Sequence, residues 1–526
     1  MDVRPAGQQW RIGRMNGAQA LVASLLASGV DTCFANPGTS EMHLVAALAE
    51  RPEMRCILGL AEGVVTGAAD GFGRMTDRPA MTLLHCGAGF ANGMANLHNA
   101  RRAGTMMVNC VGDLATYFQS LGSPLASDIK GMSATVSDWV HVADDPARLG
   151  EDAARGAAEA RRAPGRIATL IIPSDIGWSE GGSASGPQAP AAPERIDQDA
   201  LSAAANMLRR AEPVALIIGG VALRDEGLRA VDRISRGTGA TALAPQAIAR
   251  MERGGDRPCV DRIPVPAAAA REKLSRFRHL ILIGADMPSG FFAYKDMPHR
   301  IVAEDAGITV LCRPDQDVLH ALLALADLVG GPVAASAATG GTCLPATGAV
   351  DADPLAQSVC ALLPAQAIVV DESIVVGRAL FPATMTAAPH DWLQTTGGAI
   401  GDGMPLATGA AVACPGRRVV NLQADGSAMY TLQALWTQAR ERLDVTTVIL
   451  ANRSYAVLHQ EFERAGLASS RNARALLDLD DPALDWVGLA AGMGVEGAVA
   501  DSMERFNDLF ESANRRSGPF LIELRC

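Results

Sequence analysis

The stretch that decides the fold is RVVNLQADGSAMYTLQALWTQARERLDVTTVILAN, residues 418–452. Two apolar, β-branched runs, RVVNLQ and TTVIL, flank a segment with helical periodicity from about Met429 to Arg440. A strand, a helix and a second strand in this order predict parallel strands that are buried on both faces. Asp425 follows the first run and Asn452 the second, so we expect both side chains at the edge where open α/β sheets bind ligands.

The same alternation of apolar runs and helical patterns extends over the whole chain. Examples are TMMVNCVG at 105–112 and PVALIIGG at 213–220. Two stretches rich in Gly, Pro, Ala and Ser, residues 180–194 and 330–354, have no periodic pattern and are typical of linkers. The sequence therefore predicts an α/β protein with three doubly wound parallel-sheet domains, at residues 14–180, 195–330 and 355–526.

Composition excludes several classes of function. The 526 residues exceed what one hydrophobic core supports, and 48% hydrophobic with 20% charged residues is typical of a soluble globular protein. Aromatic residues are only 4% and the net charge is -11, which argues against a nucleic-acid or anionic-membrane partner. Ten Cys without a CxxC pair and nine His without HExxH argue against zinc and predict free thiols in a cytoplasmic protein.

One segment near the N-terminus has two interpretations. Arg11 and Arg14 precede the apolar run at 18–30, as in a signal peptide. The alternative is an amphipathic helix with Asn16 as its N-cap and Gly29 just past its end, followed at once by a strand. We favour the helix, and no run reaches the roughly 18 apolar residues that span a bilayer.

The oxygens that follow the two strands suit a hard cation. A carboxylate at Asp425 and an amide at Asn452 are ligands that Mg²⁺ prefers when phosphates supply the rest, and the carbonyl of Ser454 is a third candidate. Gly426 and Ser427 open the next helix, where backbone N–H groups bind phosphate. A loop without metal is the alternative. The combination predicts a metal and diphosphate site.

This constellation resembles the signature of thiamine-diphosphate enzymes, GDG followed by NN about 25 to 30 residues later. Here Asn452 follows Asp425 by 27 residues, and Ala424 and Ala451 replace the first Gly and the first Asn. Neither replacement removes a metal-ligand side chain. The resemblance implies thiamine diphosphate and Mg²⁺ as cofactors, and domains of the pyruvate-decarboxylase-like type: pyrimidine-binding, central and diphosphate-binding.

A second block resembles the conserved-glutamate segment of the benzoylformate decarboxylase and acetolactate synthase group. It is RCILGLAEGVVTGAADGFGRMTDRPA at 55–80, in which Glu62 follows a strand-like run and opens a helix. An isolated glutamate here would be explained by the helix dipole alone. The resemblance implies that Glu62 contacts the pyrimidine ring and drives loss of the thiazolium C2 proton, which produces the reactive ylid.

Two further segments extend the resemblance. FANPGTSEMHLV at 34–45 looks like the NPG-Ser turn of benzoylformate decarboxylase, and LHCGAGFANGMANLHNA at 84–100 looks like its LHSAAG segment. They imply that Thr39 lies in the active site and that His85 shuttles protons. The alternatives are a core histidine bonded to backbone and an ordinary NPGT turn.

The glycines of the second segment also permit a rival interpretation. Gly87, Gly89 and Gly93 follow a strand and mimic a dinucleotide-binding loop, with Asp113 where a ribose-binding acid is expected. This interpretation leaves the metal motif and Glu62 unexplained. We therefore discount it.

Two C-terminal segments resemble cofactor-binding segments of the same family. TTGGAIGDGMPLATG at 395–409 is similar to GGLGFALPAA, which implies that the carbonyl of Gly398 binds the pyrimidine amine and that Ile400 props the cofactor. A plain glycine-rich turn is the alternative. VVDESIVVGR at 369–378 aligns with the family's ES segment. The remaining implied diphosphate contacts are Ser373, Ile374, Val375, Tyr455 and Ala456.

The residues that would choose the substrate depart from the family pattern. Phe291 or Phe292 falls near the second histidine of benzoylformate decarboxylase, and Glu461, with His459 nearby, falls where relatives carry Phe or Trp. His459 and Glu461 could instead lie on a solvated helix. The GMHG and GARFDDR segments that accompany FAD in acetolactate synthases are missing from the sequence, so FAD is not expected.

The resemblance implies cleavage next to the carbonyl of a small 2-oxo acid, through a ylid and an enamine. A benzoylformate-decarboxylase-like decarboxylase is the first hypothesis. An acetolactate-synthase-like carboligase without FAD is the alternative, and a non-catalytic cofactor-binding paralogue is a further one. In this family Glu62 and Asp425 meet across a subunit interface, so we expect a homodimer or homotetramer with no membrane or nucleic-acid partner.

Overall fold

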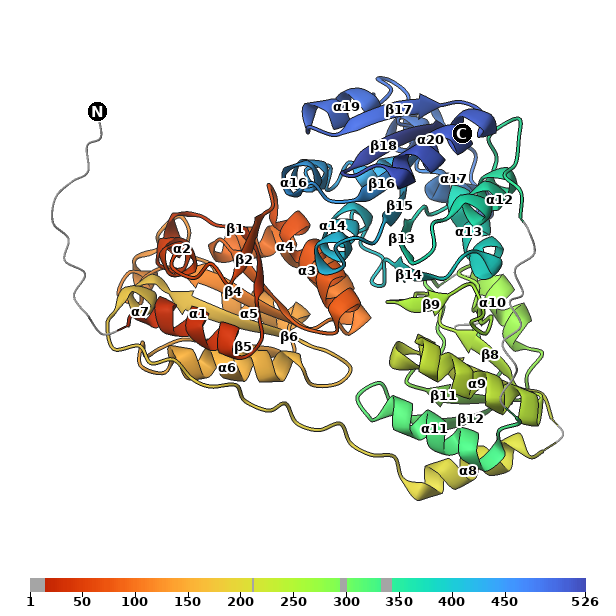
Figure 1. Cartoon of the computed structure of the whole chain (residues 1–526), viewed down its shortest axis with the longest axis horizontal. Helices are drawn as coiled ribbons and strands as arrows, with labels where there is room; N and C mark the ends of the chain where they lie inside the picture. The colour runs from red at the N-terminus through yellow and green to blue at the C-terminus, as the bar shows by residue number, and fades with distance from the viewer. Residues whose placement is uncertain (1–14, 211, 294–299, 333–342) are drawn as a thin grey trace.

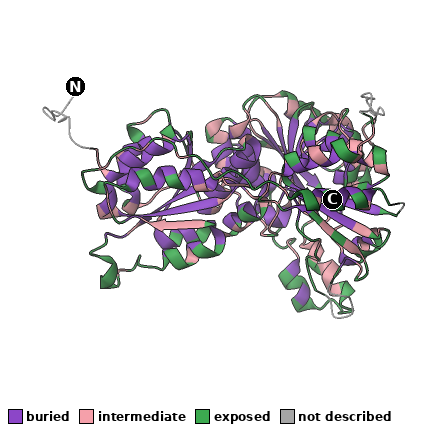
Figure 2. Cartoon of the chain, turned by 90° about the horizontal axis from the view of Figure 1, so that it is seen from below, coloured by how far each residue is buried: buried purple, intermediate pink, exposed green. Residues whose placement is uncertain are grey.

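The computed structural model describes residues 15–210, 212–293, 300–332 and 343–526, in which three sheets form three α/β domains (Figure 1). Arg11 and Arg14 lie outside the described residues. Each domain sheet has the parallel strands that the apolar runs predict, and the predicted fold class is confirmed. Figure 2 shows the strands buried inside and exposed residues on the outer helices.

The N-terminal domain has a six-stranded parallel sheet in the order β2-β1-β3-β4-β6-β5. Its strands are β1 (Thr32–Asn36), β2 (Arg55–Leu58), β3 (Ala80–Leu84), β4 (Met107–Asp113), β5 (Trp139–Val142) and β6 (Ile167–Pro173). Its helices are α1 (Gly17–Ala27), α2 (Met42–Ala49), α3 (Glu62–Thr76), α4 (Cys86–Ala103), α5 (Ile129–Val136), α6 (Leu149–Ala160) and α7 (Ser174–Trp178), with 3₁₀ turns η1 (Thr39–Glu41) and η2 (Gln119–Leu121).

Helix α1 confirms the choice of a helix over a signal peptide. The Asn16 side chain accepts a hydrogen bond from the Gln19 N–H and completes a capping box, and Gly29 follows the helix with φ +71°. The expected amphipathic character is wrong, because nearly every residue from Gly17 to Leu25 is buried. Helix α1 packs against α2, α6 and α7, so neighbouring helices cover the side that would otherwise face water.

The central domain has a five-stranded parallel sheet in the order β10-β8-β7-β11-β12. Its strands are β7 (Val214–Ile218), β8 (Thr241–Ala244), β10 (Asp261–Arg262), β11 (His279–Ile283) and β12 (Gly307–Cys312). Its helices are α8 (Gln198–Leu208), α9 (Asp225–Thr238), α10 (Ala267–Leu274) and α11 (Val318–Val329), with η3 (Gly220–Leu223). A long segment without helix or strand, residues 181–193, leads into it from the N-terminal domain (Figure 1).

The C-terminal domain has a seven-stranded sheet in the order β17-β18-β16-β15-β13-β14-β9. Its own strands are β13 (Ala367–Glu372), β14 (His390–Gln394), β15 (Val419–Ala424), β16 (Val445–Ala451), β17 (Glu496–Ala500) and β18 (Phe520–Arg525). Its helices are α12 (Ala352–Leu362), α13 (Leu380–Ala383), α14 (Gly403–Ala413), α15 (Asp425–Ala428), α16 (Ala434–Glu441), α17 (Ala456–Arg464), α18 (Arg471–Leu477), α19 (Trp486–Gly492) and α20 (Met503–Arg515), with η4 (Val376–Ala379) and η5 (Thr384–Thr386).

The seventh strand of this sheet comes from the middle of the chain. Strand β9 (Met251–Arg253) lies between β8 and β10 in sequence, yet it pairs antiparallel with β14. Next to it, Arg250 Nε donates to Asp391 Oδ1 over 2.6 Å. The sequence predicted that residues 251–253 belong to the central domain, 195–330. The chain instead enters the C-terminal sheet at β9, although the sequence around it does not have the composition of a linker.

Helices α3 and α14 join the N-terminal and C-terminal domains at very short range (Figure 1). A Cβ at Gly409 would lie 1.8 Å from the Ala68 carbonyl oxygen, and one at Gly71 would lie 2.0 Å from that of Leu406. Only glycine permits this approach of two backbones. A single buried apolar cluster runs from Phe90 through Leu406 into the C-terminal sheet, so the two domains share one core.

None of the helices in the described part of the chain has the length and apolarity needed to cross a bilayer.

Candidate active site

The strand ends of the C-terminal sheet bring Asp425 and Asn452 together as the sequence predicts. Strand β15 pairs in parallel with β16, with Ala424 opposite Leu450. Asp425 is buried, and its Oδ2 accepts a 2.6 Å hydrogen bond from the Arg453 N–H. Asn452 Oδ1 accepts one of 3.1 Å from the Ser454 N–H. The two oxygen-bearing side chains therefore lie on adjoining turns at one edge of the sheet.

The charge balance of this edge fits a hard cation. Burial raises the pKa of the Asp425 carboxyl, although hydrogen bonds from the Arg453 and Gly426 backbone oppose the rise. Among the described residues no side chain forms an ion pair with Asp425, although the charge of Arg453 also opposes the rise. A buried carboxylate without an ion-pair partner is costly, and a bound divalent ion would compensate it. The donor set of Asp425, Asn452 and the Ser454 carbonyl fits such an ion.

The helix expected from Met429 to Arg440 is shorter than predicted. Helix α15 covers only Asp425–Ala428, and α16 begins at Ala434. Between them the Thr431 hydroxyl donates to the Gly401 carbonyl over 2.8 Å, a tertiary contact that pulls the chain out of helix. The Gly426 N–H bonds to Asp425 Oδ1 over 2.8 Å. Gly426 and Ser427 therefore lie in a four-residue helix and not at the start of the longer helix we expected, and their binding of the diphosphate stays a prediction.

The other predicted diphosphate residues surround this turn. A Cβ at Gly426 would lie 2.5 Å from the Tyr455 ring, so that ring covers the turn directly. Tyr455 precedes Ala456, the first residue of α17. The segment Ser373–Val375 follows β13, and Ile374 has φ +53° and is partly exposed.

The loop of residues 395–402, named the pyrimidine loop for its predicted role, contains Gly398 and Ile400 and lies against the N-terminal domain. Gly398 has φ +78°, a conformation that favours glycine. His98 Nε2 lies 3.1 Å from the Gly397 carbonyl oxygen, and Asn99 Nδ2 donates to the Ala399 carbonyl over 2.8 Å. Helix α4 therefore holds this loop of the other domain from one side.

Glu62 begins α3 as predicted and is nearly buried. Asn92 Nδ2 donates to its Oε2 over 3.1 Å. A Cβ at Gly89 would lie 2.9 Å from Glu62 Oε1 and 3.1 Å from His85 Cβ. Glu62 and His85 are thus neighbours on either side of Gly89, and the missing side chain at Gly89 makes room for both.

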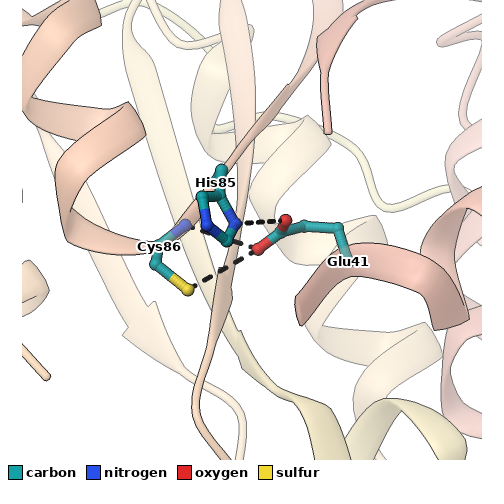
Figure 3. Close-up of side chains that lie close together, drawn as sticks. All are labelled: Glu41, His85 and Cys86. Atoms are coloured by element: carbon teal, nitrogen blue, oxygen red, sulfur yellow. Dashed lines mark hydrogen bonds and ion pairs between the residues drawn. The ribbon is translucent and has the colours of Figure 1, made fainter. Parts of the chain in front are cut away.

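His85 is fixed by a buried glutamate that sequence reasoning missed (Figure 3). Its Nδ1 lies 2.7 Å from Oε2 of Glu41, which is fully buried and also accepts a 2.8 Å hydrogen bond from the Gly38 N–H. The Cys86 N–H donates to Glu41 Oε1 over 3.3 Å. The signal in the sequence was Glu41 three residues after Gly38, the spacing of a capping box. Thr39 lies in the same turn but is exposed.

The Glu41, His85 and Cys86 ligand atoms lie within 4.8 Å of one another, which is the geometry of a metal site. The hydrogen bonds argue against that interpretation, because Glu41 uses its oxygens for two backbone N–H groups and the imidazole. Burial also raises the pKa of the Cys86 thiol to about 11, so it stays protonated and is a poor ligand. The cluster is better explained as a clamp on the imidazole.

The structure contradicts the interpretation of the glycines at 87, 89 and 93 as a dinucleotide-binding loop. Gly87, Gly89 and Gly93 lie inside α4 and not in a loop before it. A Cβ at Gly93 would meet the Thr66 side chain at 2.8 Å, so this glycine serves the packing of α4 on α3. The two Asp113 carboxylate oxygens accept hydrogen bonds from the Leu114 N–H and the Gln119 side chain, so both already have partners.

The residues predicted to line the substrate pocket lie in two places. Phe291 contacts the pyrimidine loop, because a Cβ at Gly398 would lie 3.3 Å from Phe291 Cε1, and Phe292 lies beside it. His459 Nε2 is 2.7 Å from Asp478 Oδ1, and Glu461 Oε1 is 2.8 Å from Arg464. None of the residues of α17 is fully buried in this single chain.

A separate cavity of about 1040 Å³ lies at the carboxyl ends of β7, β8 and β11. Six arginines and two aspartates line it, so it favours anions. Phe291 is shared with the predicted pocket, but Glu62, His85 and Asp425 do not line the cavity. The residues predicted to be catalytic therefore lie apart from it.

Comparison with known proteins assigns the family. A protein of Mycobacterium tuberculosis (strain ATCC 25618 / H37Rv) named "Putative acetolactate synthase large subunit IlvX" is 48% identical over 514 residues, which cover 97% of this chain and 99% of the relative. Residues 15–135 match the family model described as thiamine pyrophosphate enzyme, N-terminal TPP binding domain, and residues 378–524 match that of the C-terminal TPP binding domain. The chain belongs to the thiamine pyrophosphate enzyme family.

Other thiamine pyrophosphate enzymes are similar to this chain over nearly its whole length. Benzoylformate decarboxylase of Pseudomonas aeruginosa is 28% identical over 529 residues, covering 94% of this chain and 96% of the relative. The solved structure of a thiamine diphosphate-dependent 4-hydroxybenzoylformate decarboxylase from Rhodococcus jostii RHA1 superposes with a TM-score of 0.85 at 22% identity, covering 97% of this chain and 99% of that one. The recognised family and its three-domain fold are thereby confirmed.

Proposed function

We propose that this thiamine pyrophosphate enzyme is a benzoylformate-decarboxylase-like decarboxylase of 2-oxo acids. The observation that carries the proposal is the Glu41–His85 pair beside Glu62. Nδ1 of His85 donates a hydrogen bond to Glu41 Oε2. The other ring nitrogen, Nε2, is then the atom that exchanges a proton. A fixed proton donor next to the activating glutamate supports the branch in which the product is protonated and released as an aldehyde.

The proposed cofactor site uses residues of two domains. Asp425, Asn452 and the Ser454 carbonyl would hold Mg²⁺, and the Gly398 carbonyl and Glu62 would hold the two edges of the pyrimidine ring. When bound, thiamine diphosphate supplies a carbon nucleophile for the 2-oxo carbonyl and accepts the electron pair released with CO2. Glu62 orients the ring and holds a proton at its carboxylate, while His85 holds one for the product.

We also propose a homodimer, or a dimer of dimers, in which Glu62 of one copy completes the site of another. This proposal rests on the family resemblance, in which the conserved glutamate and the metal motif meet across a subunit interface.

A carboligase is the second candidate. Phe291 lies beside the pyrimidine loop where a second proton donor would favour aldehyde release, and a phenyl ring cannot donate a proton. The Mycobacterium tuberculosis relative is named as an acetolactate synthase large subunit, which also favours this branch. No FAD is proposed, because the sequence lacks the segments that accompany it.

Incubation with thiamine diphosphate, Mg²⁺ and a panel of 2-oxo acids tests the proposal. CO2 with one equivalent of aldehyde supports the decarboxylase, and CO2 with a coupled acyloin or acetohydroxy acid supports the carboligase. Cofactor binding without turnover on a broad panel would support a non-catalytic paralogue and refute both. Sedimentation of the holoprotein tests the dimer, and a monomer with full activity would contradict the shared site.

A further inference from the structure

Glu372 is a buried carboxylate that none of the proposed roles uses. It is the last residue of β13, between the strand and the Ser373–Val375 turn, and is 2% exposed. Burial raises its pKa, and hydrogen bonds from Gln423 and the Gly403 and Gly401 N–H groups oppose the rise. A charged group at this depth must be held by strong partners.

Its two oxygens hold the end of the pyrimidine loop. Oε1 accepts hydrogen bonds from the Gly401 N–H over 2.8 Å and the Asp402 N–H over 3.4 Å, and Oε2 accepts one from the Gly403 N–H over 2.8 Å. Gly403 begins the 11-residue helix α14, so the carboxylate also faces the positive end of a helix. A Cβ at Gly403 would lie 3.0 Å from Glu372 Oε2, and glycine permits this approach.

The same carboxylate reaches the turn at Asp425–Ala428, the predicted metal turn, through one side chain. Gln423 Nε2 lies 2.7 Å from Glu372 Oε2 and 2.7 Å from the Ser427 hydroxyl oxygen. Gln423 stands two residues before Asp425 on β15, and the Ser427 hydroxyl donates to the Ala424 carbonyl over 3.0 Å. The ends of β13 and β15 and the start of α14 thus meet at one group.

Four N–H donors stabilise the ionised form of Glu372. Its neighbour Asp402 is fully buried, and the contact of its carboxyl with Arg74 is 3.9 Å long. Burial, reinforced by Asp70, raises the pKa of the Asp402 carboxyl well above its usual range.

We propose that Glu372 is a positioning residue that sets the pyrimidine loop and the metal turn at the spacing one cofactor requires. The proposal rests on the proposed function, because it takes Gly398 and Asp425 as the two ends of the cofactor site. Glu372 touches neither the substrate nor the reacting atoms. It acts through the Gly401–Gly403 N–H groups and through Gln423.

The test is the cofactor affinity of full-length Glu372→Gln, measured by calorimetry at saturating Mg²⁺. The new NH2 group cannot accept a hydrogen bond from the backbone N–H groups that Glu372 binds. Two hydrogen-bond donors then face each other, and the loop must move. We expect the Kd for thiamine diphosphate to rise tenfold or more. A smaller rise in a folded variant overturns the proposal.

A matched control separates positioning from simple loss of stability. Asp391 is also a buried carboxylate of the C-terminal sheet, bound to Arg250 and Arg417 over 2.6 Å each, but it is the second residue of β14, toward the opposite end of the strands. Asp391→Asn should lower Tm at least as much as Glu372→Gln and leave the cofactor Kd within threefold. If Asp391→Asn weakens the cofactor as much as Glu372→Gln does, the proposal is overturned.

A second variant covers the case in which Glu372→Gln does not fold. Gln423→Leu removes the bridge to Ser427 and keeps the loop contacts, and we expect the Kd to rise threefold or more; an unchanged Kd overturns the proposal. Wild-type protein that fails to bind thiamine diphosphate with Mg²⁺ would overturn the proposed function as well. Wild-type binding with unchanged variants would overturn only the role of Glu372.

Discussion

Gly38→Ala should displace His85 without touching any proposed ligand of the cofactor. A Cβ at Gly38 would lie 2.2 Å from His85 Nδ1 and 2.5 Å from its Cγ and Cε1. Carbon contacts are optimal at about 3.5 Å or more, so the ring must retreat by about 1 Å. The backbone adds no strain, because φ at Gly38 is −114°. The whole effect therefore falls on the imidazole and its bond to Glu41.

The expected magnitude follows from that displacement. A shift of 1 Å lengthens the 2.7 Å contact between His85 Nδ1 and Glu41 beyond hydrogen-bond range. Misplacing a catalytic group by this amount costs about 10²-fold, or about 2.7 kcal/mol of transition-state stabilisation. We expect kcat/KM for the best 2-oxo acid to fall by about that factor. The Kd for thiamine diphosphate should stay within threefold, since Asp425 and Asn452 lie in another domain.

The assay is CO2 release at saturating cofactor, with a crystal structure of the variant. Gly492→Ala is the control, because a Cβ there meets nothing within 4 Å, and it should keep full activity. Activity within threefold of wild type, with the ring visibly moved, would refute the role of His85. Unchanged activity with an unmoved ring would refute the steric argument instead.

Three further predictions concern the other residues of the site and the pH dependence of stability. Glu62→Gln should keep the hydrogen bond from Asn92 and bind cofactor in calorimetry, yet lose nearly all turnover; near-normal rates would exclude the activating role. Asp425→Ala should abolish Mg²⁺-dependent cofactor binding, and tight binding by this variant would show that the metal lies elsewhere. Burial lowers the pKa of His43 and of His390 from 6.5 to about 4. The unfolded chain therefore binds these protons first, and each histidine should cost up to about 3 kcal/mol of unfolding free energy as pH falls from 6.5 to 4. Urea midpoints across this range should show a shallower slope for His43→Met, and an equal slope would contradict the assignment.

The sequence predicted those parts of the fold that depend on local patterns. Apolar runs placed the three parallel sheets, and the cap at Asn16 identified α1. The strand, turn and strand around Asp425 predicted its place beside Asn452, because parallel neighbours end at one edge. Each of these features depends on residues close together in the chain.

The features that sequence reasoning missed depend on contacts between distant segments. The expected helix from Met429 breaks because Thr431 bonds to Gly401, 30 residues away. Glu41 binds His85 across 44 residues, and the spacing of Glu41 from Gly38 indicates only a local cap, not the distant partner. The glycines of α4 looked like a nucleotide loop because the residues they pack against lie in other segments: Gly89 and Gly93 face α3, and Gly87 faces Ser127.

Strand β9 limits how this protein can be divided or recombined. A fragment beginning at residue 355 would leave the β14 edge unpaired and Asp391 without Arg250, and an exposed edge invites aggregation. Exchange of the central domain with that of a relative would have to carry β9 along or cut on both sides of it. Strand β9 thus ties the central segment to the C-terminal sheet, so these two domains have to be cut or exchanged together.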